Sequence, residues 1–535
     1  MQTLALPLSP NKAKGGLSPF CCPRGWIWLL DRALCHNGLS KNGTPLTLTA
    51  YGSARPTSRV ATAKLEQPMT SRLPFPVRLF LVMTVLPILF NAGPLALSGQ
   101  RVLLMLFVVP LTVQLLRGAY GPLIWTDFFF FLHVAWAALA ITMNNPDRAL
   151  QYVGSTGMEF LGGYLFGRAY IRSMGAFLAL IRFLATLICC TLPFALFESF
   201  TGRAILIELI AKLPGFYSVA IIDIEARMGF ERAQVLFAHP IHYGLFSSTA
   251  FSLVFVGLKD LVSTTRRYMT AVIIGCCVFL SLSSGALLPI ILQLFLIFWV
   301  YLLAGARQRW LVLLSLLIFA YVVIDILSNR PPMRVFMSYA TFSAHNAYWR
   351  GIIFEWGMIN VWGSPIFGIG LNDWVRPFFM HSSSVDNFWL LNAMQYGIPG
   401  FLLLVIGYLP SLWRIGRRNF DTDQRLWLLR RSWMFTFVGL TLTLSTVHIW
   451  TSIYSFVLFL FGAGMWFSTA EASSQQQNLD LVDRHSKDRS NSTSKLKRSI
   501  AAEIKRPLEV ITKASQEKII FSRFTDKHEK QNDIR

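Results

Sequence analysis

The sequence is poor in charged residues. Only 14% of its 535 residues are charged, whereas soluble domains are about 25% charged. Hydrophobic residues make up 54% of the chain, with 43 Phe and 16 Trp among them. This composition excludes an ordinary soluble domain and predicts an all-α protein that crosses a membrane many times.

Acidic residues are scarcer than basic ones, and the formal net charge is +22. A protein that binds nucleic acid gathers its basic residues on one exposed face. Here Lys and Arg are spread along the whole chain, so no nucleic-acid partner is expected. Membrane lipids are the expected surroundings.

Cysteine is also scarce, and its positions are uninformative about disulfides. The seven cysteines lie near the N-terminus or inside apolar runs, at positions 21, 22, 35, 189, 190, 276 and 277. None stands in a segment expected on the outer side of the membrane, so a structural disulfide is not expected. C-x-x-C pairs and metal-ligand clusters are missing too, and neither a metal nor another cofactor is predicted.

Long apolar runs are abundant. A transmembrane helix needs about 20 mostly apolar residues, and a window of that length finds about twelve candidate spans. They lie at about 76–97, 101–116, 121–142, 151–167, 175–199, 239–258, 268–283, 285–304, 310–327, 387–412, 432–449 and 451–469. The predicted fold is a bundle of these helices with a large, partly helical outer loop before the tenth.

Lys and Arg concentrate in alternate loops, which predicts cytoplasmic N- and C-termini. Residues 76–469 form the predicted membrane domain. Residues 1–75 are predicted to be a cytoplasmic extension that is disordered or precedes the natural start, for which Met69 is a candidate. Residues 470–535 are polar and are predicted to be a disordered cytoplasmic tail.

Two predicted outer loops, about 200–238 and 328–386, carry arginine against this charge bias. The arginines are Arg203, Arg227, Arg232, Arg330, Arg334, Arg350 and Arg376. Salt bridges to nearby acids would be a purely structural explanation, and the acids are Glu225, Glu231, Glu355 and Asp373. The alternative is phosphate binding, because the planar guanidinium fork matches phosphate oxygens bidentately.

Three further features of these loops have two readings each. His239 precedes Pro240, and proline suits the first turn of a helix. His239 is therefore either a helix-entry residue or a substrate contact. Trp349 and Trp356 share one face of a predicted helix at 348–359, either as interfacial aromatics or for sugar stacking. Asp386 directly precedes an apolar run, where it is expected to cap the helix, with a catalytic role also compatible.

Several motifs together resemble the O-antigen ligase and polymerase family. The first is R-A-x-x-x-F-x-H-P-x-x-x-G at Arg232, followed by LSLSSGA at 280–286. The second large loop adds P-x-x-G-x-G at Pro365 and N-x-x-L-x-x-x-x-x-x-G-x-x-G at Asn387. NDWVRP, SVDNFWL, YGIPGF and TVHIW are most similar to the exopolysaccharide-polymerase branch.

The resemblance covers about 76–469 and implies a metal-independent membrane glycosyltransferase of the bacterial inner membrane. Its donor would be a glycan on undecaprenyl pyrophosphate, transferred to an acceptor hydroxyl on the periplasmic side. Carried over by position, Arg232 and Arg350 would bind the pyrophosphate, with Arg376 and His239 as further substrate contacts. A flippase and chain-length or export proteins would be partners.

The departure from the family pattern lies at Asp386, where ligases usually have a histidine. Asp386 is the predicted general base, with His381 and His448 as alternative or assisting bases. This substitution favours a polymerase of lipid-linked repeat units over a ligase that transfers finished glycan to a lipid A core. A polysaccharide transporter or a non-catalytic assembly partner are alternatives, although a transporter would be expected to carry more charge inside its spans.

Overall fold

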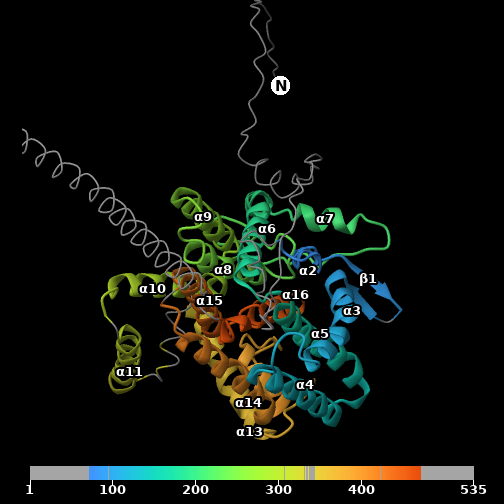
Figure 1. Cartoon of the computed structure of the whole chain (residues 1–535). Helices are drawn as coiled ribbons and strands as arrows, with labels where there is room; N and C mark the ends of the chain where they lie inside the picture. The colour runs from blue at the N-terminus through green and yellow to red at the C-terminus, as the bar shows by residue number, and fades with distance from the viewer. Residues whose placement is uncertain are drawn as a thin grey trace, which may run out of the picture. The chain divides into compact units, whose positions relative to one another are not determined.

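The computed structural model describes residues 72–93, 95–306, 308–329, 332, 335, 344–421 and 423–470 (Figure 1). These residues belong to one compact unit. Nearly all of the predicted extension, 1–75, and of the predicted tail, 470–535, lies outside the described residues.

Helices make up almost all of the described secondary structure. They are α2 (Phe75–Val85), α3 (Gly99–Leu116), α4 (Trp125–Asn144), α5 (Pro146–Tyr170), α6 (Met174–Thr201), α7 (Ile205–Ala211), α8 (Pro240–Phe255), α9 (Thr264–Leu280), α10 (Ser284–Leu302), α11 (Arg309–Leu327), α13 (Ala344–Gly363), α14 (Phe388–Arg417), α15 (Gln424–Thr443), α16 (Thr451–Gly462) and the short 3₁₀ helix η1 (Met465–Ser468). The predicted all-α class is confirmed.

Seven of the described helical segments are long and apolar enough to cross a membrane. They are α3, α4, α6, α10, α11, α14 and the segment Thr451–Ser468. Four other predicted spans coincide with α5, α8, α9 and α15, which are shorter or more polar. These spans are 151–167, 239–258, 268–283 and 432–449. α11 buries none of its side chains, as expected of a helix surrounded by lipid. The chain is a multi-pass membrane protein.

The first predicted span, 76–97, is wrong as a continuous helix. α2 ends at Val85, and a hairpin of β1 (Leu89–Ala92) and β2 (Leu95–Ser98) follows. Pro87 explains the interruption, because proline lacks the N–H that would continue the helix and restricts the residue before it to extended backbone. Leu86 has that extended conformation, with φ −92° and ψ 102°.

Close backbone contact holds α5 against α16. A Cβ on Gly167 would lie 2.1 Å from the Phe459 carbonyl oxygen, and a Cβ on Gly462 would lie 2.2 Å from that of Tyr164. Small residues are favoured where membrane helices pack, because lipid offers no hydrophobic drive and close packing must supply the attraction.

The second large loop returns to the bundle at a break in α14. Gly397 has φ 70° and ψ 178° inside this helix, and a Cβ there would lie 2.1 Å from the Ile366 carbonyl oxygen. The freed backbone bonds to the loop: Ile369 N–H donates to Met394 O at 2.8 Å, and Ile398 N–H donates to Pro365 O at 2.8 Å. The P-x-x-G-x-G and YGIPG motifs therefore form one unit, beside which α13 packs on α14 (Figure 1).

Candidate active site

A cavity of about 220 Å³ collects residues from five separate segments of the chain. Its lining consists of Ile224, Arg227, Arg232, His239, Ile241, Ser283, Ser284, Trp349, Arg350, Ile353 and Asp386. We call it the arginine cavity. It brings together four residues that the sequence analysis proposed: Arg232, His239, Arg350 and Asp386.

Asp386 is exposed and stands two residues before α14. The expectation that it caps this helix is wrong, because Asn387 is the N-cap and its side-chain oxygen accepts from Leu390 N–H at 3.0 Å. The Asp386 carboxylate accepts only from the Ser384 hydroxyl, at 3.1 Å, among the hydrogen bonds of the described residues. The carboxylate is thus not occupied by the helix and lines the cavity.

Arg350 extends from α13 into the same space. Its Nη1 is buried and has no hydrogen-bond partner among the described residues. Burial lowers the pKa of Arg350, the nearby Asp386 raises it, and Arg227 lowers it further. A buried guanidinium nitrogen without a partner is costly, so an anionic ligand would satisfy it.

Arg232 and Arg227 come from the first large loop and bond to the turn before α10. Arg232 Nε donates to Ser281 O at 3.4 Å, and Arg227 Nη1 donates to Leu282 O at 2.9 Å. Burial, and then the charge of Arg227, lower the pKa of Arg232 to about 10, so it stays cationic at neutral pH. Both contacts involve the LSLSSGA motif, which explains why the motif lies next to the site.

Salt bridging explains only part of the outer arginine excess. Arg376 pairs with Asp373, and Arg203 pairs with Glu208 at 2.6 Å. Within the described part of the chain, Arg227, Arg232 and Arg350 make no ion pair. The sequence analysis did not single out Arg227 as a site residue, although its position against the charge bias was the available signal.

The position of His239 fits both proposed roles, helix entry and substrate contact. It is the N-cap of α8, and its Nδ1 accepts from Ile241 N–H at 3.1 Å, while the ring lines the cavity. Burial, and then the charge of Arg232, lower the pKa of His239 to about 4. The imidazole is therefore neutral at pH 7 and adds no positive charge.

Two helix N-termini add to the positive potential of the arginine cavity. α8 begins next to His239 and α10 begins at Ser284, both at the cavity. The Ser283 side chain makes no capping bond to α10, so it is available to a ligand. The free N–H groups and the dipole at a helix N-terminus favour anions.

Three proposed site residues do not line the cavity. His381 is exposed, and Arg376 pairs with Asp373 and donates to Met380 O at 3.0 Å. His448 stacks between Phe388 and Trp450, with ring centroids 6.5 Å and 5.6 Å away. Burial lowers the pKa of His448 to about 4. Their catalytic or binding roles stay predictions.

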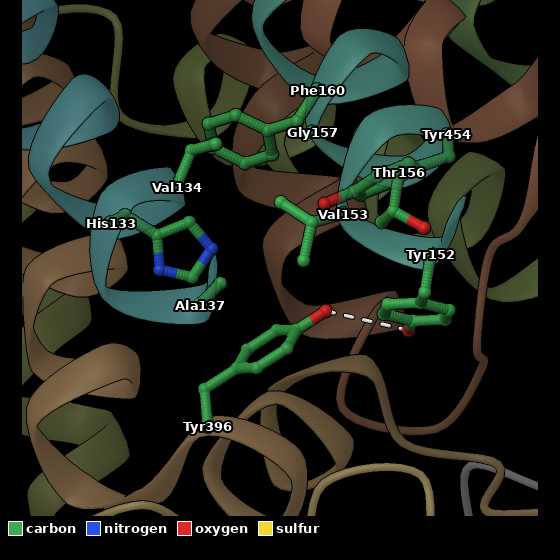
Figure 2. A pocket seen from close by; sticks show the side chains of 10 residues that line it. All are labelled: His133, Val134, Ala137, Tyr152, Val153, Thr156, Gly157, Phe160, Tyr396 and Tyr454. Carbon is green, nitrogen blue, oxygen red and sulfur yellow. Dashed lines mark hydrogen bonds between the residues drawn. The ribbon is translucent and has the colours of Figure 1, made fainter. Parts of the chain in front are cut away.

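A second, much smaller pocket of about 20 Å³ lies between α4, α5, α14 and α16 (Figure 2). We call it the tyrosine pocket, after Tyr152, Tyr396 and Tyr454. Figure 2 shows the rings of His133 and Tyr396 facing Val153 across it. Tyr152 bonds to Gln395 at 3.3 Å and to the Tyr396 hydroxyl at 3.4 Å. The volume suits about one water molecule, not a substrate.

Comparison with known families now bears on the arginine cavity. Residues 269–405 match the family model described as O-antigen ligase. This segment belongs to an O-antigen ligase/polymerase-like family. It contributes Ser283, Ser284, Trp349, Arg350 and Asp386 to the cavity, whereas Arg227, Arg232 and His239 come from outside it.

Members of this family are glycosyltransferase-like enzymes, and the match supports O-antigen ligase/polymerase-type function in this general sense. A comparison with curated proteins found no match. Among the described residues, no group of three or more His, Cys, Asp or Glu side chains has metal-binding geometry. The cavity is built instead from guanidinium groups, hydroxyls and one carboxylate.

Proposed function

We propose that the protein polymerises lipid-linked oligosaccharide repeat units into exopolysaccharide or O-antigen. The donor is a glycan on undecaprenyl pyrophosphate, and the acceptor is a hydroxyl of a second lipid-linked unit. The observation that carries this proposal is the arginine cavity, where three arginines without an ion pair in the described structure face one available carboxylate.

Charge supports a pyrophosphate ligand. Arg227, Arg232 and Arg350 contribute three positive charges and Asp386 one negative charge, so the lining has an excess of two positive charges while His239 is neutral. A pyrophosphate diester is a dianion, which this excess balances. Guanidinium groups also supply paired N–H donors for its oxygens.

The reaction breaks the bond between the anomeric carbon and the pyrophosphate oxygen, and forms a bond from that carbon to the acceptor oxygen. The acceptor proton passes to the Asp386 carboxylate, and the lipid pyrophosphate leaves with one more negative charge. Arg232 and Arg350 stabilise this developing charge as preorganised donors. Asp386 acts as general base, a role that typically contributes about 100- to 10,000-fold.

The proposed location is the bacterial inner membrane, with both termini cytoplasmic and the cavity on the periplasmic side. The charge bias of the loops supports this orientation. The substrate would then arrive through a flippase, and chain-length or export proteins would receive the product.

Substitution of Asp386 tests the proposal. Asp386→Asn keeps the shape of the side chain and removes its basicity, so we expect inserted protein with chain growth reduced at least 100-fold. The measurement is polymer length on gels after purified protein in nanodiscs is given lipid-linked repeat units. Asp223→Asn is the control, because Asp223 is an exposed acid of the first large loop that does not line the cavity.

The accumulated material separates the polymerase from the ligase that the family description names. A strain lacking the protein should accumulate short lipid-linked repeat units if it is a polymerase. Long lipid-linked polymer would instead identify a ligase. Normal polymer from Asp386→Asn would remove this carboxylate from the mechanism.

A further inference from the structure

A row of aromatic rings runs from the arginine cavity to the surface. Trp349 lines the cavity, and its ring lies 6.0 Å from that of Phe379. Phe379 in turn lies 5.5 Å from Phe378, with the two rings nearly perpendicular. Phe378 is 94% exposed and Phe379 is 45% exposed.

The loop that carries these two phenylalanines is held by several hydrogen bonds. Asn360 on α13 bonds to both backbone groups of Val375, donating to its carbonyl at 2.8 Å and accepting from its N–H at 2.9 Å. Arg376 donates to Met380 O at 3.0 Å, and Trp374 Nε1 donates to Ser383 O at 3.0 Å. A loop fixed at both ends in this way presents its exposed rings in a preorganised arrangement.

Exposed rings in such an arrangement are typical of a binding site. A phenylalanine left in water forfeits the free energy of burying its ring, so exposed apolar groups that cluster often mark binding sites. Two classes of ligand cover exposed rings of this kind, namely lipid chains and sugars. A sugar ring suits them because its apolar C–H face packs on the electron-rich face of an aromatic ring.

The neighbouring charges favour sugar over lipid. Asp373, whose side chain is 64% exposed, pairs with Arg376 on the same loop. Inserting this loop into hydrocarbon would bury both charges, which is costly. A hydrated saccharide instead offers hydroxyls to the exposed carboxylate while its apolar face covers the rings.

We propose that Trp349, Phe379 and Phe378 form an aromatic platform that binds the saccharide of the lipid-linked substrate while the arginine cavity holds its pyrophosphate. This rests on the proposed function. Arg376 is a positioning residue of the platform, since it holds the backbone on which both phenylalanines stand.

Replacing the rings with leucine tests the platform. Leucine keeps apolarity for contact with lipid but loses the flat face, so Phe378→Leu and Phe379→Leu should each bind saccharide about three- to tenfold more weakly. Phe379→Tyr should bind within about twofold of the original protein, because the ring remains. Trp362→Leu is the matched control, as Trp362 is an exposed aromatic of α13 outside the row.

Binding is measured on the full chain in nanodiscs by saturation-transfer NMR. The probe is oligosaccharide released from the host's own surface polysaccharide by partial acid hydrolysis, and it carries no pyrophosphate. Undiminished binding by both leucine variants would overturn the platform. Weaker binding by the Trp362→Leu control to the same extent would overturn it too, because the effect would then be general to exposed aromatics.

The two proposals fail separately. The NMR measurement reports saccharide binding without turnover, so the platform can fail while Asp386→Asn still abolishes polymerisation. Conversely, normal polymerisation by Asp386→Asn would remove the proposed chemistry while platform binding is still measured directly.

Discussion

The arginine cavity and the tyrosine pocket differ in how their polar groups are satisfied. In the tyrosine pocket, His133 Nδ1 bonds to Gly400 O at 2.8 Å and the Tyr152 hydroxyl bonds to Gln395 and Tyr396. In the arginine cavity, Arg350 Nη1 is buried with no partner in the described structure, and Asp386 accepts only a serine hydroxyl.

This difference separates a structural contact region from a binding site. Polar groups that bond to one another, as Tyr152 and Tyr396 do in the tyrosine pocket, rigidify the bundle and are occupied by the protein. Polar groups that stay incompletely satisfied cost stability in the empty protein, and a ligand recovers that cost. The first pattern predicts mutations that affect stability, and the second predicts mutations that affect activity.

The largest expected effect is on activity at the arginine cavity. Arg350→Gln removes a buried cation that faces the pyrophosphate, so we expect the rate of polymerisation to fall about 100- to 1,000-fold. The measurement is the turnover of lipid-linked repeat units in nanodiscs. Arg203→Gln is the control, because this exposed arginine is already paired with Glu208 and should keep full activity. Equal losses in both variants would contradict the comparison.

A large effect on stability is expected at the tyrosine pocket. Phe160 is 1% exposed and packs against Phe130 and His133, with ring centroids 4.9 Å and 5.1 Å away. Phe160→Ala should destabilise the fold by roughly 3 kcal/mol, because it opens a cavity in a packed region.

The unfolding transition in detergent measures this change, and turnover per folded molecule should stay within about twofold of the original protein. A loss of turnover without a loss of stability would place the tyrosine pocket in the reaction.

The last expected effect concerns pH. The pKa of His448 is lowered by burial from its ordinary value of 6.5 to about 4. Between these pH values the unfolded chain binds a proton at His448 that the folded protein does not, so stability falls as the pH falls through this range.

His448→Gln should therefore flatten part of the decline in unfolding temperature between pH 6.5 and 4. The original protein, measured over the same pH range, is the reference. An identical pH profile for His448→Gln and the original protein would show that His448 does not carry this dependence.

Periodicity and hydropathy were enough to predict most of the helices, because lipid requires long apolar segments whose backbone bonds are internal. They did not predict the hairpin after Val85, since its residues are as apolar as a span and only Pro87 marks the change. They also assigned the cap of α14 to Asp386, although the neighbouring Asn387 is an equally good N-cap and sequence alone does not rank the two.

For the site, sequence patterns singled out Arg232, His239, Arg350 and Asp386, and the cavity contains all four. Arg376 also lies in an outer loop against the charge bias, but it is paired with Asp373 and does not line the cavity. Arg227 was named among the arginines of its loop but was not proposed as a site residue, although it lines the cavity.

The sequence by itself predicted the class of protein and the family that residues 269–405 match, because both depend on local patterns: apolar length, loop charge and motif spacing. Only the tertiary structure decided which arginines share a cavity and make no ion pair with the residues that the structure describes. That outcome depends on distances between segments far apart in the chain, which packing of α8, α10, α13 and α14 sets. It also decided that Asn387 caps α14, which leaves the Asp386 carboxylate available at the cavity.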